Sequence, residues 1–185
     1  MRPAVFLDRD DTLMAANSLP APPPPAAPGD VIDPSLVRLL PGVLEGCRRL
    51  RSAGFVLIVV SNQGVVARGG GTLEAVEAVN ARLRDLLRDT SGRSLIEATY
   101  FCPFHPKGRV PRWTAEHPWR KPGGGMILAA AEELGLDLAS SWLIGDADRD
   151  VAAGIAAGLR PERCLRIGGL LTFDAAVGRV LSGVV

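Results

Sequence analysis

Cysteine and long apolar runs are scarce in this chain. Its 185 residues include three cysteines, Cys47, Cys102 and Cys164, an odd number at wide spacing, so a disulfide framework is not expected. The longest strand-like apolar run, Phe55 to Val60, is too short to cross a bilayer. Asp8 interrupts the first apolar run, which leaves no room for the core of a secretory signal. These absences predict a cytoplasmic protein.

An excess of charge of either sign is also lacking. The chain has 21 Lys and Arg against 20 Asp and Glu, a net charge of +1, and its basic residues are scattered. We therefore expect no nucleic-acid partner and no membrane partner. Residues 1–185 are of a length that suits one domain. We take the protein to be a monomer.

Short apolar runs alternate with segments of helical period. The runs predict strands over residues 4–7, 55–60, 98–101, 142–144 and 164–167. Helices are expected from Val43 to a stop at Gly54, over 73–87 with Thr72 as cap, over 126–134, and over 151–157. Continuous apolar strands suit a parallel sheet covered on both faces. The alternation favours a doubly wound, Rossmann-like α/β fold.

Two segments break this alternation, and we treat them as loop insertions at about 14–34 and 102–125. The first contains the proline-rich run Pro20 to Asp30, which predicts a semi-rigid excursion near the first polar cluster. The second, Cys102 to Gly125, is rich in Pro, Gly, His and Trp and is typical of a functional loop.

Polar side chains follow three of the predicted strands. The residues at these strand ends are Asp8 and Asp10, then Ser61 and Asn62, then Asp146 and Asp150. Because ligands of such folds bind beyond the carboxyl ends of the strands, we expect the three clusters to form one site.

The spacing of Asp8 and Asp10 indicates acid–base chemistry at a cation. Two carboxylates at i and i+2 in a turn can share one small volume, and such a pair needs a hard cation such as Mg²⁺. One can attack phosphorus while the other handles a proton. The alternative is a plain acidic turn. Likewise, Ser61 to Gly64 is either a phosphate cradle or a strand exit, and Arg120-Lys121 is either a phosphate clamp or a solvated basic pair.

Taken together, these segments resemble the four motifs of the haloacid dehalogenase (HAD) superfamily. The matching stretches are Asp8-x-Asp10-x-Thr12, Ser61-Asn62-Gln63-Gly64, Arg120-Lys121-Pro122, and Gly145 to Asp150. The resemblance implies that Asp8 is the nucleophile, Asp10 the general acid/base and Thr12 the residue that orients Asp10. It also implies that Mg²⁺ is held by the Asp8 carboxylate, the Asp10 backbone carbonyl and Asp146, with Asp150 in support.

The match narrows to one group within that superfamily. Phe6 to Asp10, Ser61-Asn62-Gln63 with Ala67-Arg68-Gly69, Cys102-Pro103-x-His105-Pro106, and Arg120 to Met126 are similar to the heptose 1,7-bisphosphate phosphatases and the related histidinol-phosphate phosphatases. This implies a HAD core with little or no cap and a sugar bisphosphate as substrate. Substrate-binding residues would be Ser61, Asn62, Gln63, Arg68, Arg120 and Lys121. Histidinol phosphate, another small phosphoester, and a phospho-ligand-binding protein without turnover remain as alternatives.

The loop at 102–125 departs from that group, whose members usually bind a structural Zn²⁺ there. Of its usual ligand positions only Cys102 is kept, and His105 and His117 are possible substitutes. A closed zinc site needs four ligands and these supply at most three, so we expect no zinc and a loop held by packing of Phe104, Trp113 and Trp119. A residual metal site is the alternative.

Asp11 is a second departure, since it replaces the glycine that is typical after the second aspartate. This added carboxylate could alter metal affinity or repel an anionic substrate.

Overall fold

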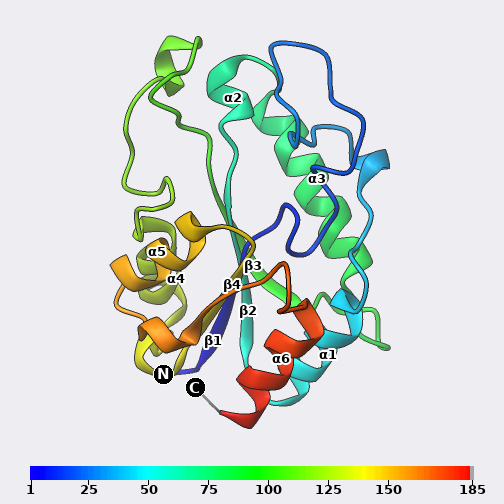
Figure 1. The fold of residues 1–185 in the computed structure, drawn as a ribbon, viewed down its shortest axis with the longest axis vertical. Coiled ribbons are helices and arrows are strands. Elements are labelled where there is room, and N and C mark those ends of the chain that lie inside the picture. The colour runs from blue at the N-terminus through cyan, green and yellow to red at the C-terminus, as the bar shows by residue number, and fades with distance from the viewer. Residues whose placement is uncertain (184–185) are drawn as a thin grey trace.

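The computed structural model describes residues 1–183, and a sheet of five parallel strands runs through its centre (Figure 1). The strands are β1 (Ala4–Leu7), β2 (Val56–Asn62), β3 (Ile96–Cys102), β4 (Trp142–Gly145) and β5 (Cys164–Arg166). Their order in the sheet is β3-β2-β1-β4-β5. All five predicted strands are confirmed; β2 and β3 run further than predicted, and Ile167 lies outside β5.

Helices cover both faces of the sheet. The helices are α1 (Val43–Ser52), α2 (Val65–Arg68), α3 (Leu73–Leu86), α4 (Gly125–Leu134), α5 (Asp148–Ala156) and α6 (Phe173–Ser182). Side chains of β1 alternate between the two faces: Val5 and Leu7 pack with α1, α3 and α6, whereas Ala4 and Phe6 pack with α4 and α5. Figure 1 shows these two groups of helices on opposite sides of the strands. The predicted doubly wound α/β fold is confirmed.

Local signals explain where most helices begin and end. The Thr72 hydroxyl accepts a hydrogen bond from the backbone N–H of Ala75, which confirms the predicted cap of α3. Gly135, at φ 63°, ends α4 as predicted. The predicted start of α5 at Val151 is wrong by three residues. The helix begins at Asp148, because acidic side chains in the first turn favour the positive end of the helix dipole.

Polar strand ends meet where the strand order reverses. From β1 the chain moves outward to β2 and β3, then returns to place β4 on the other side of β1. The backbone N–H of Asp8 donates to the carbonyl of Ile144 at 3.0 Å, so the segments that follow β1 and β4 lie side by side. This reversal opens a crevice at the carboxyl edge of the sheet, where such folds bind ligands.

The two irregular segments lie beyond this carboxyl edge (Figure 1). The proline-rich run contains no helix or strand, but it packs Ala26 against Val65, Val66 and Val76 in a small apolar cluster. The second segment is irregular over residues 103–124 apart from a short 3-10 turn, Pro111–Trp113. Within residues 1–183, no helix has the length and apolar character needed to span a membrane.

Candidate active site

Three carboxylates converge at the crevice between β1 and β4. Asp8 follows β1, Asp146 follows β4, and Asp150 lies in the first turn of α5. One carboxylate oxygen from each lies within 4.8 Å of the others. Gly145 makes this approach possible, because a Cβ atom there would lie 2.4 Å from the Cβ of Asp150. The predicted grouping of these three residues is therefore what the structure shows.

Lys121 supplies the positive charge of this cluster. Its Nζ lies 2.5 Å from Asp8 Oδ1 and 2.6 Å from Asp150 Oδ1, and it donates to the carbonyl of Val60 at 2.9 Å. Burial lowers the pKa of Lys121, but the carboxylates of Asp8 and Asp150 outweigh burial and leave that pKa raised. The ammonium therefore stays charged in a site from which water is almost excluded.

One cation does not balance three carboxylates. Burial raises the pKa of Asp8 to about 7, and Asp150 and Asp10 add to the rise while Lys121 opposes it. Burial and Asp150 also raise the pKa of Asp146. Asp8 Oδ2 and Asp146 Oδ1 are buried and have no hydrogen-bond partner among the described residues. Oxygen ligands of this kind fit a hard divalent cation, which would restore the charged forms of these groups.

Asp10 is held by a network that the sequence analysis did not foresee. Arg9, which is fully buried, donates from Nε to Asp10 Oδ1 and from Nη2 to Asp10 Oδ2, both at 3.2 Å. Gln63 donates to Asp10 Oδ2 at 2.9 Å and Ser61 lies 3.4 Å from the same oxygen. The Thr12 hydroxyl, expected to orient Asp10, is buried and has no partner among residues 1–183. Arg9 and Gln63, rather than Thr12, fix this carboxylate here.

Asn62 contacts Lys121 instead of facing the crevice with a free amide. Its Oδ1 accepts from the Lys121 backbone N–H at 2.9 Å, and its Nδ2 donates to the Lys121 carbonyl at 3.0 Å. The end of β2 is thereby joined to the loop that carries the lysine. Ser61 is buried and accepts from Gln63 Nε2 at 2.8 Å.

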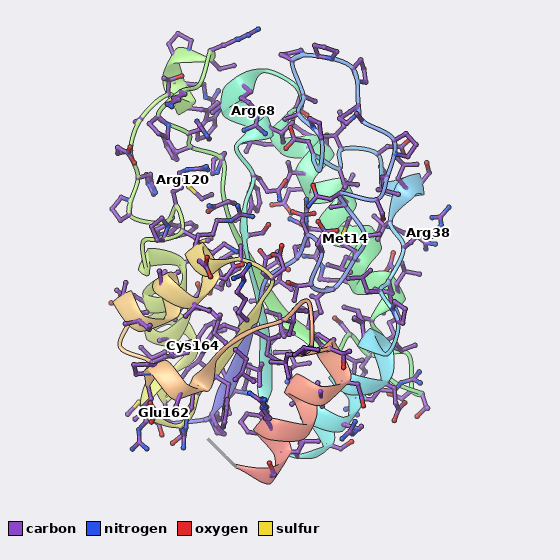
Figure 2. The ribbon with its side chains drawn as sticks, viewed as in Figure 1. Met14, Arg38, Arg68, Arg120, Glu162 and Cys164 are labelled. Carbon is purple, nitrogen blue, oxygen red and sulfur yellow. The ribbon has the colours of Figure 1, made fainter. Side chains whose placement is uncertain are left out.

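Arg68 and Arg120 lie together with His105 at the entrance to the crevice. A Cβ atom on Gly64 would lie 3.0 Å from Arg68 Nη1, 3.1 Å from His105 Cδ2 and 3.4 Å from Arg120 Nη1. The three side chains can therefore approach one another because Gly64 has no side chain. Figure 2 shows Arg68 at α2 and Arg120 on the 103–124 loop, both beyond the carboxyl edge of the sheet. Arg68 is paired with Asp30 of the proline-rich run, with both contacts at 2.7 Å.

These cations raise the electrostatic potential at the entrance. Burial lowers the pKa of Arg120, and the charges of Arg149 and Arg68 lower it further. Burial, Arg120 and Arg68 likewise lower the pKa of His105. An anion bound between these groups would relieve their repulsion.

The residues considered for zinc are not brought together. The His105 ring accepts from the Lys107 N–H, while the His117 ring accepts from the Trp119 N–H and stacks on Phe104 at a centroid distance of 4.3 Å. Cys102 is buried beside the Phe104 carbonyl. In the part of the chain that the structure describes, only Asp8, Asp146 and Asp150 form a group close enough to share an ion.

The Asp11 carboxylate is bonded to the following loop, yet it lies near enough to Asp146 for its charge to raise the pKa of that carboxyl group. It accepts hydrogen bonds from the backbone N–H groups of Ala16 and Asn17 and from the Asn17 side chain. Its φ of 55° explains why glycine suits this position.

Comparison with known proteins agrees with this geometry. Residues 118–162 match the family described as HAD-hydrolase-like. A D-glycero-beta-D-manno-heptose-1,7-bisphosphate 7-phosphatase from Yersinia pestis is 33% identical over 184 residues, which cover 98% of this chain and 91% of that protein. The D-glycero-D-manno-heptose-1,7-bisphosphate 7-phosphatase of Thermosynechococcus vestitus is 37% identical over 81% of this chain and 72% of its own length. The chain belongs to the HAD-like phosphatases.

Solved structures place this HAD-like phosphatase in the same fold. A HAD-like phosphatase from Mesorhizobium loti is 31% identical, has a TM-score of 0.78, and matches over 98% of this chain and 85% of that one. The D,D-heptose 1,7-bisphosphate phosphatase of B. bronchiseptica, complexed with magnesium and phosphate, shares the fold at 22% identity, with a TM-score of 0.75 and coverage of 98% and 99%.

Proposed function

We propose that this HAD-like phosphatase hydrolyses a sugar bisphosphate such as D-glycero-D-manno-heptose 1,7-bisphosphate, with Asp8 as nucleophile and Mg²⁺ as cofactor. One observation carries the proposal: Asp8 has one oxygen paired with Lys121 and the other buried without a partner, beside two further carboxylates. A carboxylate in this state is held in place yet has an oxygen free to react.

The reaction has two steps. Asp8 forms a bond to phosphorus as the ester P–O bond breaks, and the leaving alkoxide takes a proton from Asp10. A water molecule then gives its proton to Asp10 and attacks the same phosphorus, which releases inorganic phosphate and restores Asp8. Lys121 and Ser61 stabilise the phosphoryl oxygens throughout.

Residues of this chain would also hold the cation. Asp8, Asp146 and the Asp10 carbonyl are the proposed ligands, with Asp150 in support. Bound Mg²⁺ would neutralise the carboxylates and the phosphoryl oxygens. Asn62 would position Lys121 rather than touch phosphate directly, because both groups of its amide are already bonded to the lysine backbone.

The entrance supports a substrate with two phosphates. Arg68 and Arg120 lie near each other across Gly64. Arg68 is already paired with Asp30, whereas Arg120 donates a hydrogen bond to the neutral Phe104 carbonyl at 3.2 Å. Arg120 is therefore the better candidate to bind the second phosphate. The names of the Yersinia pestis and Thermosynechococcus vestitus relatives agree with such a substrate.

Phosphate release with Mg²⁺ from a panel of esters tests the activity. The panel contains heptose 1,7-bisphosphate, the corresponding monophosphate, histidinol phosphate and p-nitrophenyl phosphate. We expect the bisphosphate to give the highest kcat/KM and Asp8→Asn to reduce every rate to background. Equal release by wild type and Asp8→Asn would contradict the mechanism. Binding of sugar phosphates without any turnover would instead identify a binding protein, and fastest turnover of histidinol phosphate would replace the substrate.

The role of Arg120 is tested by comparing the two heptose substrates. Arg120→Ala should raise KM for the bisphosphate roughly 10- to 100-fold, because it removes the binding free energy of a hydrogen bond to a charged group. The KM for the monophosphate should change little. Arg160→Ala, at an exposed arginine at the start of a short turn far along the chain, serves as the control. An equal rise with both substrates would contradict a contact to the second phosphate.

A cytoplasmic location and action as a monomer without nucleic-acid or membrane partners belong to the same proposal. The net charge of +1 supports the absence of nucleic-acid and membrane partners, and three free, buried cysteines suit a reducing compartment.

A further inference from the structure

A fully buried arginine lies directly behind the acid/base Asp10. Arg9 has no exposed surface, whereas the Asp10 side chain keeps 21% of its own. The guanidinium contacts both carboxylate oxygens: Nε lies 3.2 Å from Oδ1, and Nη2 lies 3.1 Å from Oδ1 and 3.2 Å from Oδ2. Such a fork fixes the plane of the carboxylate as well as its position.

The far side of the same guanidinium is anchored to α3. Arg9 Nη1 donates to Asn80 Oδ1 at 2.8 Å. Asn80 is 1% exposed, and its Nδ2 has no partner among residues 1–183. A buried amide that leaves its own donor unsatisfied is costly in a helix that otherwise packs with apolar side chains. Among the described residues, the hydrogen bond from Arg9 explains why a polar Asn80 side chain is buried here.

Charge favours the contact between Arg9 and Asp10 whenever the Asp10 carboxylate is ionised. A guanidinium stays protonated in proteins, so a buried one requires an anion beside it. In the described part of the chain, Asp10 is the acidic residue paired with Arg9. If Asp10 rotated out of the fork, Arg9 would remain as an uncompensated buried charge. The ionised carboxylate is thereby confined to the orientations that keep this pair, and the hydrogen bonds from Arg9 and Gln63 hold the group when it carries the proton.

From this chain of contacts we infer that Arg9 is a positioning residue for Asp10, and that Asn80 holds Arg9 in place. The inference rests on the proposed function, in which Asp10 donates a proton to the leaving group. Arg9 transfers no proton and touches no substrate; it sets where the proton donor stands. Its loss should therefore matter in proportion to how strongly the leaving group needs that proton.

Two substrates separate this role from a merely structural one. The p-nitrophenolate group leaves without protonation, whereas the alkoxide of a sugar phosphate does not. The rate of the first step is measured with both substrates, as the burst of p-nitrophenolate and as single-turnover release of the sugar. The proteins are wild type, Asp10→Asn, Arg9→Met, Arg9→Lys, Asn80→Leu and the exposed α3 control Arg82→Met.

Arg9→Met should follow Asp10→Asn: about a 100-fold slower first step with the sugar phosphate, as general-acid catalysis commonly supplies, and a burst rate within about threefold of wild type. Arg9→Lys and Asn80→Leu should also slow the first step with the sugar phosphate more than the burst of p-nitrophenolate, but to a smaller degree. Arg82→Met should slow neither. Equal losses with both substrates, or no loss, would overturn the inference. If Arg9→Met does not fold, the loss of first-step rate with the sugar phosphate relative to the loss with p-nitrophenyl phosphate is compared for Asn80→Leu instead. Failure of the proposed function is distinct, since wild type would then hydrolyse neither substrate.

Discussion

Asp11 adopts a backbone conformation that few side chains tolerate. At φ 55° it lies in the left-handed region, where an ordinary residue is strained by about 1 kcal/mol relative to glycine. Its carboxylate offsets that strain by accepting hydrogen bonds from the loop at Ala16 and Asn17. The hydrogen bonds to the loop thus account for an aspartate at this position.

A pair of substitutions separates strain from hydrogen bonding. Asp11→Ala loses the hydrogen bonds and keeps the strain, so its free energy of unfolding should fall by about 2–3 kcal/mol. Asp11→Gly loses the same bonds but relieves the strain, so it should be about 1 kcal/mol more stable than the alanine variant. Urea unfolding of the two variants beside wild type measures this order. An alanine variant as stable as the glycine variant would contradict a strained backbone at this position.

At the same scale, the sequence predicts which residues lie in the site better than it predicts their contacts. Asp8, Asp146, Asp150 and Lys121 meet as expected. Arg9 was passed over because a basic residue between two aspartates has no distinctive spacing. Its anchor comes from a helix about seventy positions further along the chain. Side-chain partners of that kind depend on tertiary packing, which the local pattern does not contain.

Among the elements, the loop at 103–124 is stabilised by aromatic rings. Phe104 packs edge-on against Trp113 at 5.0 Å between centroids and stacks face to face with His117 at 4.3 Å. Each contact of this kind contributes on the order of 1 kcal/mol beyond the area it buries. The expectation that no zinc is bound stays a prediction, and these contacts support it.

Removal of the central ring tests that prediction. Phe104→Ala should lower the free energy of unfolding by about 1–3 kcal/mol, because the ring is only partly buried. The zinc chelator 1,10-phenanthroline should leave the wild-type melting temperature unchanged, and the purified protein should carry less than about 0.1 equivalents of zinc. Leu128→Ala, which truncates an exposed apolar side chain on α4, is the control. One equivalent of zinc that disappears in Cys102→Ser would contradict the prediction.

Elements with strong local signals were predicted well, and elements without them were not. Five apolar runs gave five strands because parallel strands buried on both faces need continuous apolar sequence. The helix α6 is not among the predicted helices, although Thr172 caps it and Phe173, Ala176 and Val177 follow at helical spacing. A local signal for this helix is therefore present in the sequence. The four-residue helix α2 had no comparable signal, since its span is too short to show a period.

At the scale of the whole molecule, the reversal of strand order places like charges together at the price of stability. Asp8 and Asp146 leave neighbouring strands and meet in the crevice, where Asp8 is buried and Asp146 half-buried, and burial raises the pKa of both. A carboxyl group whose pKa is higher in the folded state holds its proton longer there than in the unfolded chain. Without a cation, its contribution to stability is therefore lost as pH rises from about 4 toward 7.

Asp146→Asn should separate this cost from the benefit of the metal. Without Mg²⁺ at pH 7 the variant should melt slightly above wild type, by less than about 1 kcal/mol in free energy because solvent screens this half-buried group. At about one hundred times the dissociation constant, Mg²⁺ should stabilise wild type by about 2.7 kcal/mol. The variant should respond little. The wild-type response should fade below about pH 7, where Asp8 takes up its proton and competes with the cation.

Thermal unfolding with and without Mg²⁺ at pH 5, 7 and 8 measures all of these effects. Asp148→Asn is the matched control, since it removes an exposed carboxylate two residues away that is not one of the three converging groups. A variant at Asp146 that kept the full Mg²⁺ response would remove this residue from the ligand set. A wild-type response equal at pH 5 and pH 8 would mean that cation binding does not displace a proton from Asp8. A Mg²⁺ response that is larger at pH 8 than at pH 5 would tie the stability of the fold to the charge state of Asp8. The reversal of strand order creates both the crevice and the repulsion between carboxylates that the metal relieves.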